Sequence, residues 1–162
     1  MAVARWSTPS AELTQRLAFR LRAGAPSNAR SALWQRDGQL LLVHLTTLRV
    51  SVKDGWLLAD LFVETEPTGR RLLQFVFFLG SDGEGDGSQA GATIHTDSRE
   101  AAQLAQLWGS ELQRVLWDGV LDVLEGCLAL AERRLPGRSL NILGFSCGSD
   151  QLHVDIEAEG GA

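Results

Sequence analysis

The spacing of apolar residues near the N-terminus predicts a helix. An apolar residue recurs at every fourth position, as in a helix that packs by one narrow face: Leu13, Leu17 and Leu21. Thr8 can cap this helix and Pro9 suits its first turn, while Gly24 lies where a helix would end. The predicted N-terminal helix therefore covers residues 8–23.

Apolar runs separated by turn-forming residues predict an antiparallel meander of about four strands. Asp-Gly pairs at 37–38 and 54–55 and a Pro-Thr-Gly turn at 67–69 suit the tight turns of hairpins. The strands between these turns cover residues 31–36, 39–52, 56–66 and 71–79. The last of them is apolar on both faces, which favours a central place in the sheet. A further short strand is a candidate at 93–96.

A helical region follows at residues 97–135, and it is either one long helix or a broken one. A straight helix of this length would measure about 55 Å, against roughly 40 Å for a compact domain of this size. This difference favours a break at Gly109, with Ser110 capping a second segment. Asp97 opens the first segment as the start of a capping-box pattern.

The C-terminal part predicts a β-hairpin. Residues 140–147 and 151–159 read as strands, and the second alternates apolar and polar residues strictly. The chain is therefore predicted to be a single α+β domain, residues 1–162, in which one antiparallel sheet packs against the helices. Residues 80–92 are expected to form a flexible loop rich in Gly and Asp, and residues 160–162 a disordered tail.

Composition places this chain among ordinary folding domains. Of its 162 residues 44% are hydrophobic and 22% charged, and the formal net charge is −5. A net negative charge argues against nucleic acid or an anionic membrane as the main partner. Residues 1–36 nevertheless carry a charge of +5, and the remainder −10. The N-terminus lacks signal-peptide features and no apolar run reaches membrane-spanning length, so a cytoplasmic protein is expected. Cys127 and Cys147 are expected to be reduced structural thiols.

An acidic glycine-rich stretch resembles the first half of a calcium-binding loop. Asp82, Glu84 and Asp86 alternate with glycine, as oxygen ligands do in such loops. The twelfth position, which should be a bidentate carboxylate, is Thr93. The stretch is therefore a candidate cation site, and the alternative is a solvated loop.

The last predicted strand presents a second candidate metal site. His153, Asp155 and Glu157 project from one face, at spacings of about 6.6 Å. This spacing is too wide for one ion, so a metal site centred on His153 and Asp155 would need His44, His95 or Asp97 nearby. The alternative is the solvated face of an edge strand. No cofactor-binding motif is recognised, and no cofactor is expected.

An acidic stripe on the long helical region is a candidate protein interface. Asp118, Asp122 and Glu125 share one side of the helix. Arg16 and Arg20 of the N-terminal helix are the expected partners of this stripe, either within the chain or across a dimer. The alternative is an ordinary solvated face.

The chain offers little evidence for nucleophilic catalysis. Gly144, Ser146 and Gly148 match a Gly-x-Ser-x-Gly pattern, but that motif requires a turn from a strand into a helix. Here one predicted strand leads into another. His44 lies on an apolar strand and is interpreted as a core histidine rather than a catalytic base.

These observations lead to two functional hypotheses. The first is a non-catalytic protein-binding or chaperone-like module that binds its partners through exposed strand edges and faces. This module is expected to form a homodimer. The order of a helix, a meander, a long helix and a hairpin resembles the type III secretion chaperones and the YbjN-like proteins. This resemblance implies a role in binding other proteins. The second hypothesis is a small-molecule or metal-binding protein, including an enzyme, that uses the concave face of the sheet with His95, Asp97, His153 and Asp155.

Overall fold

The computed structural model describes residues 2–80 and 91–159, and this part of the chain is an α+β fold of two helices and nine strands. The α+β class predicted from the sequence is thus confirmed. In chain order the elements are β1 (Ala2–Pro9), α1 (Ser10–Leu21), β2 (Ser31–Arg36), β3 (Gln39–His44), β4 (Arg49–Lys53), β5 (Gly55–Thr65), β6 (Gly69–Gly80), β7 (Gly91–His95), α2 (Arg99–Arg134), β8 (Leu140–Cys147) and β9 (Gln151–Ala158).

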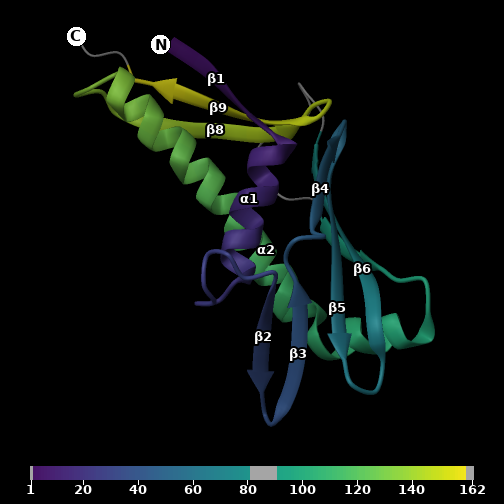
Figure 1. Ribbon diagram of the computed structural model, residues 1–162. Helices are drawn as coiled ribbons and strands as arrows, with labels where there is room; N and C mark the ends of the chain where they lie inside the picture. The colour runs from purple at the N-terminus through teal and green to yellow at the C-terminus, as the bar shows by residue number, and fades with distance from the viewer. Residues whose placement is uncertain (1, 81–90, 160–162) are drawn as a thin grey trace.

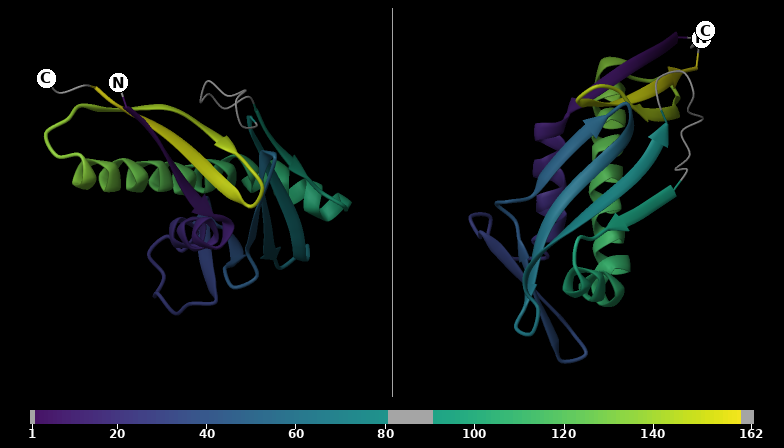
Figure 2. Two further views of the ribbon diagram at one scale, coloured as in Figure 1. Left: turned by 90° about the horizontal axis from the view of Figure 1, so that it is seen from above. Right: turned by 90° about the vertical axis from the view of Figure 1, so that its right-hand side faces the viewer.

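The strands form two antiparallel sheets, whereas the sequence predicted one. The larger sheet has the strand order β2-β3-β5-β6-β7, with β4 also paired to β5, and the smaller has the order β1-β9-β8. Figure 1 shows α1 beside α2, with the smaller sheet at one end of the molecule. The left view of Figure 2 shows α2 running past both sheets. The prediction of a single sheet is wrong because the meander and the C-terminal hairpin pack against different parts of helix α2.

Helix α2 is continuous over 36 residues, so the expected break at Gly109 is wrong. The helix is about 54 Å long and spans an elongated molecule. Gly109 instead allows α2 to pack closely against β7, because a Cβ atom placed there would lie 2.6 Å from the Cδ1 atom of Ile94. The N-cap is Ser98 and not Asp97, since the Ser98 side chain accepts a hydrogen bond from the backbone N–H of Ala101.

Helix α1 begins at Ser10, two residues later than predicted, and its cap comes from the distant β8–β9 turn. Pro9 is at the N-cap position and makes no side-chain cap. The backbone N–H of Ser10 donates to the carbonyl oxygen of Asp150, and the Ser10 hydroxyl donates to the Asp150 carboxylate at 2.7 Å. Thr8, predicted to be the cap, is a buried residue of strand β1.

Strand β1 was missed in the sequence. It pairs with β9 along its full length, from Ala2 opposite Ala158 to Pro9 opposite Gln151. Trp6 is half-buried and Thr8 buried, whereas the intervening Ser7 is exposed, which is the alternation of a strand with one covered face. The C-terminal hairpin was predicted correctly, and β1 extends it to three strands.

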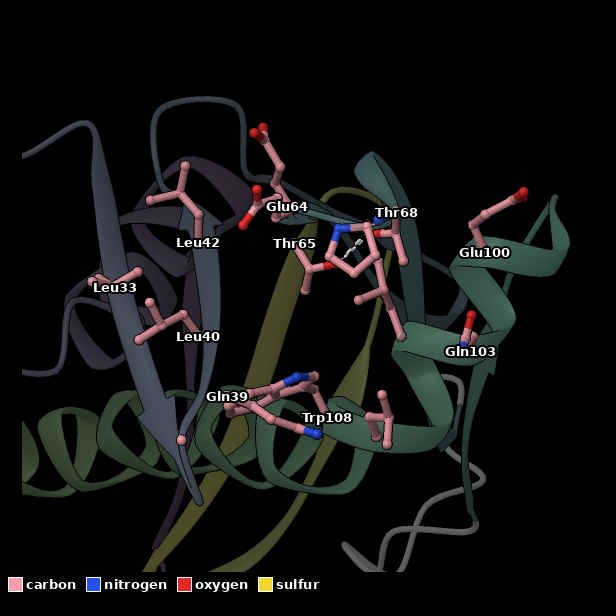
Figure 3. A pocket seen from close by; sticks show the side chains of 15 residues that line it. Leu33, Gln39, Leu40, Leu42, Glu64, Thr65, Thr68, Glu100, Gln103 and Trp108 are labelled. Carbon is pink, nitrogen blue, oxygen red and sulfur yellow. Dashed lines mark hydrogen bonds between the residues drawn. The ribbon is translucent and has the colours of Figure 1, made fainter.

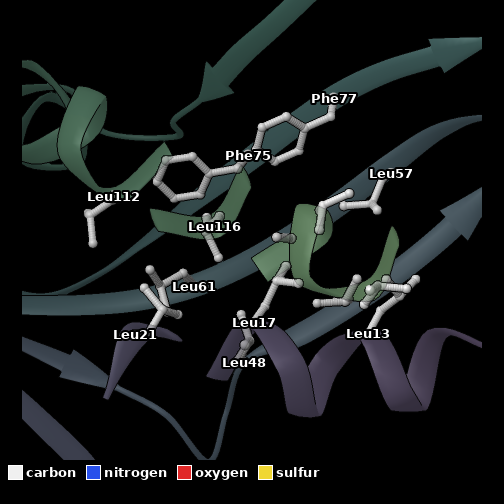
Figure 4. Close-up of a cluster of buried hydrophobic side chains, with 14 of the residues drawn as sticks. Leu13, Leu17, Leu21, Leu48, Leu57, Leu61, Phe75, Phe77, Leu112 and Leu116 are labelled. Atoms are coloured by element: carbon white, nitrogen blue, oxygen red, sulfur yellow. The ribbon is translucent and has the colours of Figure 1, made fainter. Parts of the chain in front are cut away.

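The core lies where α1, α2 and the larger sheet meet. The predicted stripe Leu13, Leu17 and Leu21 is completely buried. Figure 4 shows these leucines facing the phenylalanines of β6 and the leucines of α2. The two helices cross closely at Gly119, where a Cβ atom would lie 3.0–3.2 Å from atoms of Leu17.

Two further strand boundaries differ from the predictions. The predicted strand 39–52 is two strands, β3 and β4, separated by a turn in which the N–H of Leu48 donates to the carbonyl of Leu45. Both ends of the predicted loop 80–92 belong to strands, because β6 extends to Gly80 and β7 begins at Gly91. Residues 81–90 and the predicted tail 160–162 lie outside the described residues.

Candidate functional site

A groove opens where the β2–β3 hairpin diverges from the rest of the larger sheet. Strand β3 pairs with β5 at only two positions, Leu42 with Glu64 and Val43 with Val63. Strand β5 then ends at Thr65 and turns away, so the outer half of β3 has no β5 residue to pair with. The resulting groove of about 700 Å³ lies between the hairpin, the β5–β6 turn and the first turns of α2 (Figure 3).

The walls of the groove are mainly apolar, and several of their side chains are exposed. Leu33 of β2 is 63% exposed, Leu40 of β3 is 52% exposed and Leu107 of α2 is 44% exposed. Leu104 and Trp108 line the groove more deeply and are buried. Single exposed leucines are common on protein surfaces, but apolar side chains that converge on one concavity mark a binding surface.

The rim of the groove is acidic. Glu64 lies near the end of β5, Glu66 in the turn that follows β5, and Glu100 in the first turn of α2, and all three line the groove. Figure 3 shows Glu64 and Glu100 on opposite sides of it. His44 Nε2 lies 3.2 Å from Glu64 Oε1. An apolar floor inside a carboxylate rim favours ligands that combine apolar and cationic groups.

Two anchors hold the hairpin in place, so the groove is formed before any ligand binds. At the tip, Arg36 donates to Glu111 Oε2 at 2.9 Å and to the carbonyl oxygen of Leu107, and its guanidinium stacks over Trp108, 4.4 Å from the ring centre. Further along β2, the Trp34 indole N–H donates to the carbonyl oxygen of Leu21 at 3.0 Å. Preformed sites lose less conformational entropy on binding.

The predicted contact between the arginines of α1 and the acidic stripe of α2 is present within the chain. Arg20 donates twice to the Asp122 carboxylate, at 2.5 and 2.6 Å. The hydrogen bond from Arg20 lowers the pKa of Asp122, and the nearby charge of Arg16 lowers it further. The hydrogen bond to Asp122 and its charge raise the pKa of Arg20, and the charges of Asp118 and Glu125 raise it further. A role for these residues in binding a partner stays a prediction.

This ion pair predicts an acid-dependent contribution to stability. The folded-state pKa of Asp122 is below its ordinary value of 3.8, so the stabilisation is complete above that value and is lost as the pH falls through the lowered pKa. We expect Asp122→Asn to be less stable than the wild type at pH 7, with a difference that shrinks to nothing on acidification below pH 3.8. Urea unfolding across this pH range tests it, and a constant difference would contradict it.

His153 and Asp155 lie on the outer face of the smaller sheet, each beside a residue of β1. His153 Nδ1 is 2.7 Å from the Ser7 hydroxyl oxygen. Arg5 donates to both oxygens of Asp155, at 2.8 and 3.1 Å, and this hydrogen bonding lowers the pKa of Asp155. His95 is on β7 of the other sheet, 3.2 Å from the Thr93 hydroxyl.

The part of the chain that the structure describes holds no group of three His, Cys, Asp or Glu side chains arranged for a metal ion. The candidate ligands Asp82, Glu84 and Asp86 lie outside the described residues. His153 and Asp155 therefore have no third ligand within residues 2–80 and 91–159. Neither they nor His95 and Asp97 line the groove.

The Gly-x-Ser-x-Gly pattern lacks the turn that its chemistry requires. Ser146 is buried near the end of β8, and a turn then leads into β9 rather than into a helix. Cys127 and Cys147 are both buried and free. Burial raises the pKa of the Cys147 thiol to about 12, which disfavours the reactive thiolate. No helix in the described residues has the length and apolar character needed to cross a membrane.

The comparisons with known proteins found no match. No family model matches the chain, and the searches of the curated proteins and of the solved structures gave no match. The resemblance to the type III secretion chaperones and YbjN-like proteins therefore rests on element order alone, and the observed order differs by the additional strand β1 and the division into two sheets.

One feature of the sequence indicates the groove, although by itself it predicts only a strand. Leu40-Leu41-Leu42-Val43 is a continuous apolar run in β3. Leu41 and Val43 are buried, so Leu40 and Leu42 must face the other way. A strand that is apolar on both faces needs two covered sides, and in this fold one side of β3 faces the groove.

Proposed function

We propose that this chain is a non-catalytic protein-binding module of the chaperone or adaptor kind, which holds an apolar segment of another polypeptide in the groove. The observation that carries the proposal is the convergence of Leu33, Leu40 and Leu107, all largely exposed, on one preformed concavity. No residue of the described ranges covers them. A surface of this kind is stabilised when a partner's apolar side chains exclude water from it.

The exposed leucine surface supports transient rather than permanent binding. Complete burial of a leucine side chain contributes about 1.5–3 kcal/mol, and these three leucines are already partly buried. Covering their exposed fractions therefore contributes about 2–5 kcal/mol, which corresponds to dissociation constants of roughly 0.2 mM or weaker. Charged contacts at the rim are needed for useful affinity.

The rim specifies the charge of the partner. Glu64, Glu66 and Glu100 surround the apolar floor, and opposite charges across an interface increase both specificity and the association rate. The preferred partner segment therefore carries apolar side chains flanked by lysine or arginine. A segment flanked by acidic residues is disfavoured by like-charge repulsion.

A pair of matched peptides tests this function. We expect a fluorescent leucine-rich peptide flanked by lysines to bind, and the same peptide flanked by glutamates to bind at least about tenfold more weakly. Leu40→Ser should weaken binding of the lysine peptide by about tenfold, because it removes apolar area from the groove wall. Fluorescence anisotropy measures both effects.

The matched control is Leu143→Ser. Leu143 of β8 is 46% exposed, close to the value for Leu40, but it lies outside the groove. This substitution should leave binding of the lysine peptide unchanged. Equal loss in both variants, or equal affinity for both peptides, would show that binding is non-specific and would contradict the proposed function.

A second candidate is a small-molecule-binding protein that uses the same groove. Its volume of about 700 Å³ falls within the range of ligand sites, roughly 300–1,000 Å³. The lining carboxylates of Glu64, Glu66 and Glu100 favour a small molecule that carries a positive charge. Native mass spectrometry on gently purified protein separates the two candidates: a stoichiometric small-molecule adduct that Leu40→Ser removes would favour this one.

A further inference from the structure

Helix α1 carries an exposed aromatic side chain among arginines. Phe19 is 63% exposed, and it lies on the side of α1 opposite the buried stripe of leucines. The Arg22 guanidinium lies over the Phe19 ring, 5.1 Å from its centre. Arg16 is also exposed and lies one turn earlier on the same side of the helix. We call Arg16, Phe19 and Arg22 the α1 knob.

The α1 knob complements the groove in charge and shares its apolar character. The knob is a protruding apolar ring beside two cations, and the groove is an apolar hollow beside three carboxylates. The match reflects the uneven charge of the chain, in which residues 1–36 carry +5 and the remainder −10. Phe19 is exposed in the single chain, so its own groove does not hold it.

We propose that the groove of one copy of this chain binds the α1 knob of a second copy. This inference rests on the proposed function, and it names the partner as the chain itself. Reciprocal exchange, with each knob in the other copy's groove, closes into a dimer with twofold symmetry. The two linked contacts reinforce each other, since the second forms within an existing complex, and a dimer can therefore persist although each contact alone is weak.

Charge reversal on the two sides tests the pairing. We expect Arg16→Glu with Arg22→Glu to raise the dimer dissociation constant at least about tenfold, and so should Glu64→Lys with Glu66→Lys and Glu100→Lys. All five substitutions in one chain restore opposite charges across the interface, so this variant should dimerise again. Sedimentation velocity over a range of concentrations measures each constant, and circular dichroism confirms that each variant is folded.

The rescue distinguishes this pairing from other dimers. If two α1 helices packed against each other, the groove reversals would have no effect. If two grooves met, the helix reversals would have none, and in neither case would the combined variant be rescued. Phe19→Ser provides an independent check, because it should weaken the dimer without changing any charge. Full-strength association of Phe19→Ser, or absence of rescue, overturns the inference.

Failure of the self-pairing can be distinguished from failure of the proposed protein-binding function. A wild-type chain that stays monomeric at all concentrations, yet binds the lysine-flanked peptide in the groove, contradicts the self-pairing and leaves the protein-binding function intact. A chain that neither self-associates nor binds that peptide contradicts both. High salt should weaken the dimer, since it screens the arginine and glutamate charges.

Discussion

Phe75→Ala is expected to lower the free energy of unfolding by about 3–5 kcal/mol. The Phe75 ring is fully buried, and in Figure 4 it lies between strand β6 and the leucines of α2. Truncation removes the transfer energy of the ring and leaves a cavity that neighbours on a sheet and a long helix can only partly fill. Equilibrium unfolding in urea, monitored by tryptophan fluorescence, measures the change.

Phe19→Ala is the matched control for this prediction. It removes the same atoms from an exposed position, so the unfolding free energy of the monomer should change by no more than about 0.5 kcal/mol. The comparison is made on dilute protein, where association does not contribute. A cost for Phe75→Ala as small as that for Phe19→Ala would mean that the core lies elsewhere.

Gly119→Ala should destabilise the protein by about 1–3 kcal/mol, although alanine is the better helix former. A Cβ atom at this position would lie 3.1 Å from the Cα atom of Leu17 and 3.0 Å from its Cδ1 atom. The backbone atom cannot move without shifting α1, so the two helices must separate. Thermal unfolding followed by circular dichroism measures the loss.

Gly126→Ala, on the same helix, should instead increase the stability of the protein. A Cβ atom at Gly126 meets no other atom within 4 Å, so the substitution only improves helix propensity, by up to about 1 kcal/mol. Gly109→Ala is expected between the two, because the atom it meets is the flexible tip of Ile94. Stabilisation by Gly119→Ala equal to that by Gly126→Ala would contradict the close helix crossing.

Local patterns predicted the elements whose signals lie within a few residues. The leucine repeat of α1 and the strict alternation in β9 each reflect one face that must be buried, and both were interpreted correctly. Cap positions were less accurate, because tertiary contacts replaced local ones. Asp150, more than a hundred residues away, caps α1 at Ser10, a contact that no local pattern encodes.

The elements that were missed depend on how distant segments meet. A break in α2 was expected because the domain was assumed to be compact, and a second sheet on the C-terminal half of the helix removes that limit. Likewise, the groove exists because β5 ends at Thr65 while the β2–β3 hairpin continues. The length difference between two strands is visible in the sequence only once their register is known.

The acidic stripe shows how far a charge pattern can be interpreted. The sequence predicted that Arg20 and Asp122 belong to complementary surfaces, and the structure pairs them within one chain. Of the other arginines of this helix, Arg16 is exposed, and the half-buried Arg22 lies over the Phe19 ring. The same charge asymmetry thus contributes to helix packing through Arg20 and to the proposed pairing of two copies through Arg16 and Arg22.

The most direct test of the binding groove is a methyl NMR spectrum of leucine-labelled protein, recorded before and after addition of the lysine-flanked peptide. The account predicts that the methyl signals of Leu33, Leu40 and Leu107 shift, because these exposed side chains line the groove. The signals of Leu130 and Leu143, which are similarly exposed outside the groove, should stay in place. Shifts confined to Leu130 and Leu143, or no shifts at a saturating peptide concentration, would contradict the assignment of the groove as the binding site.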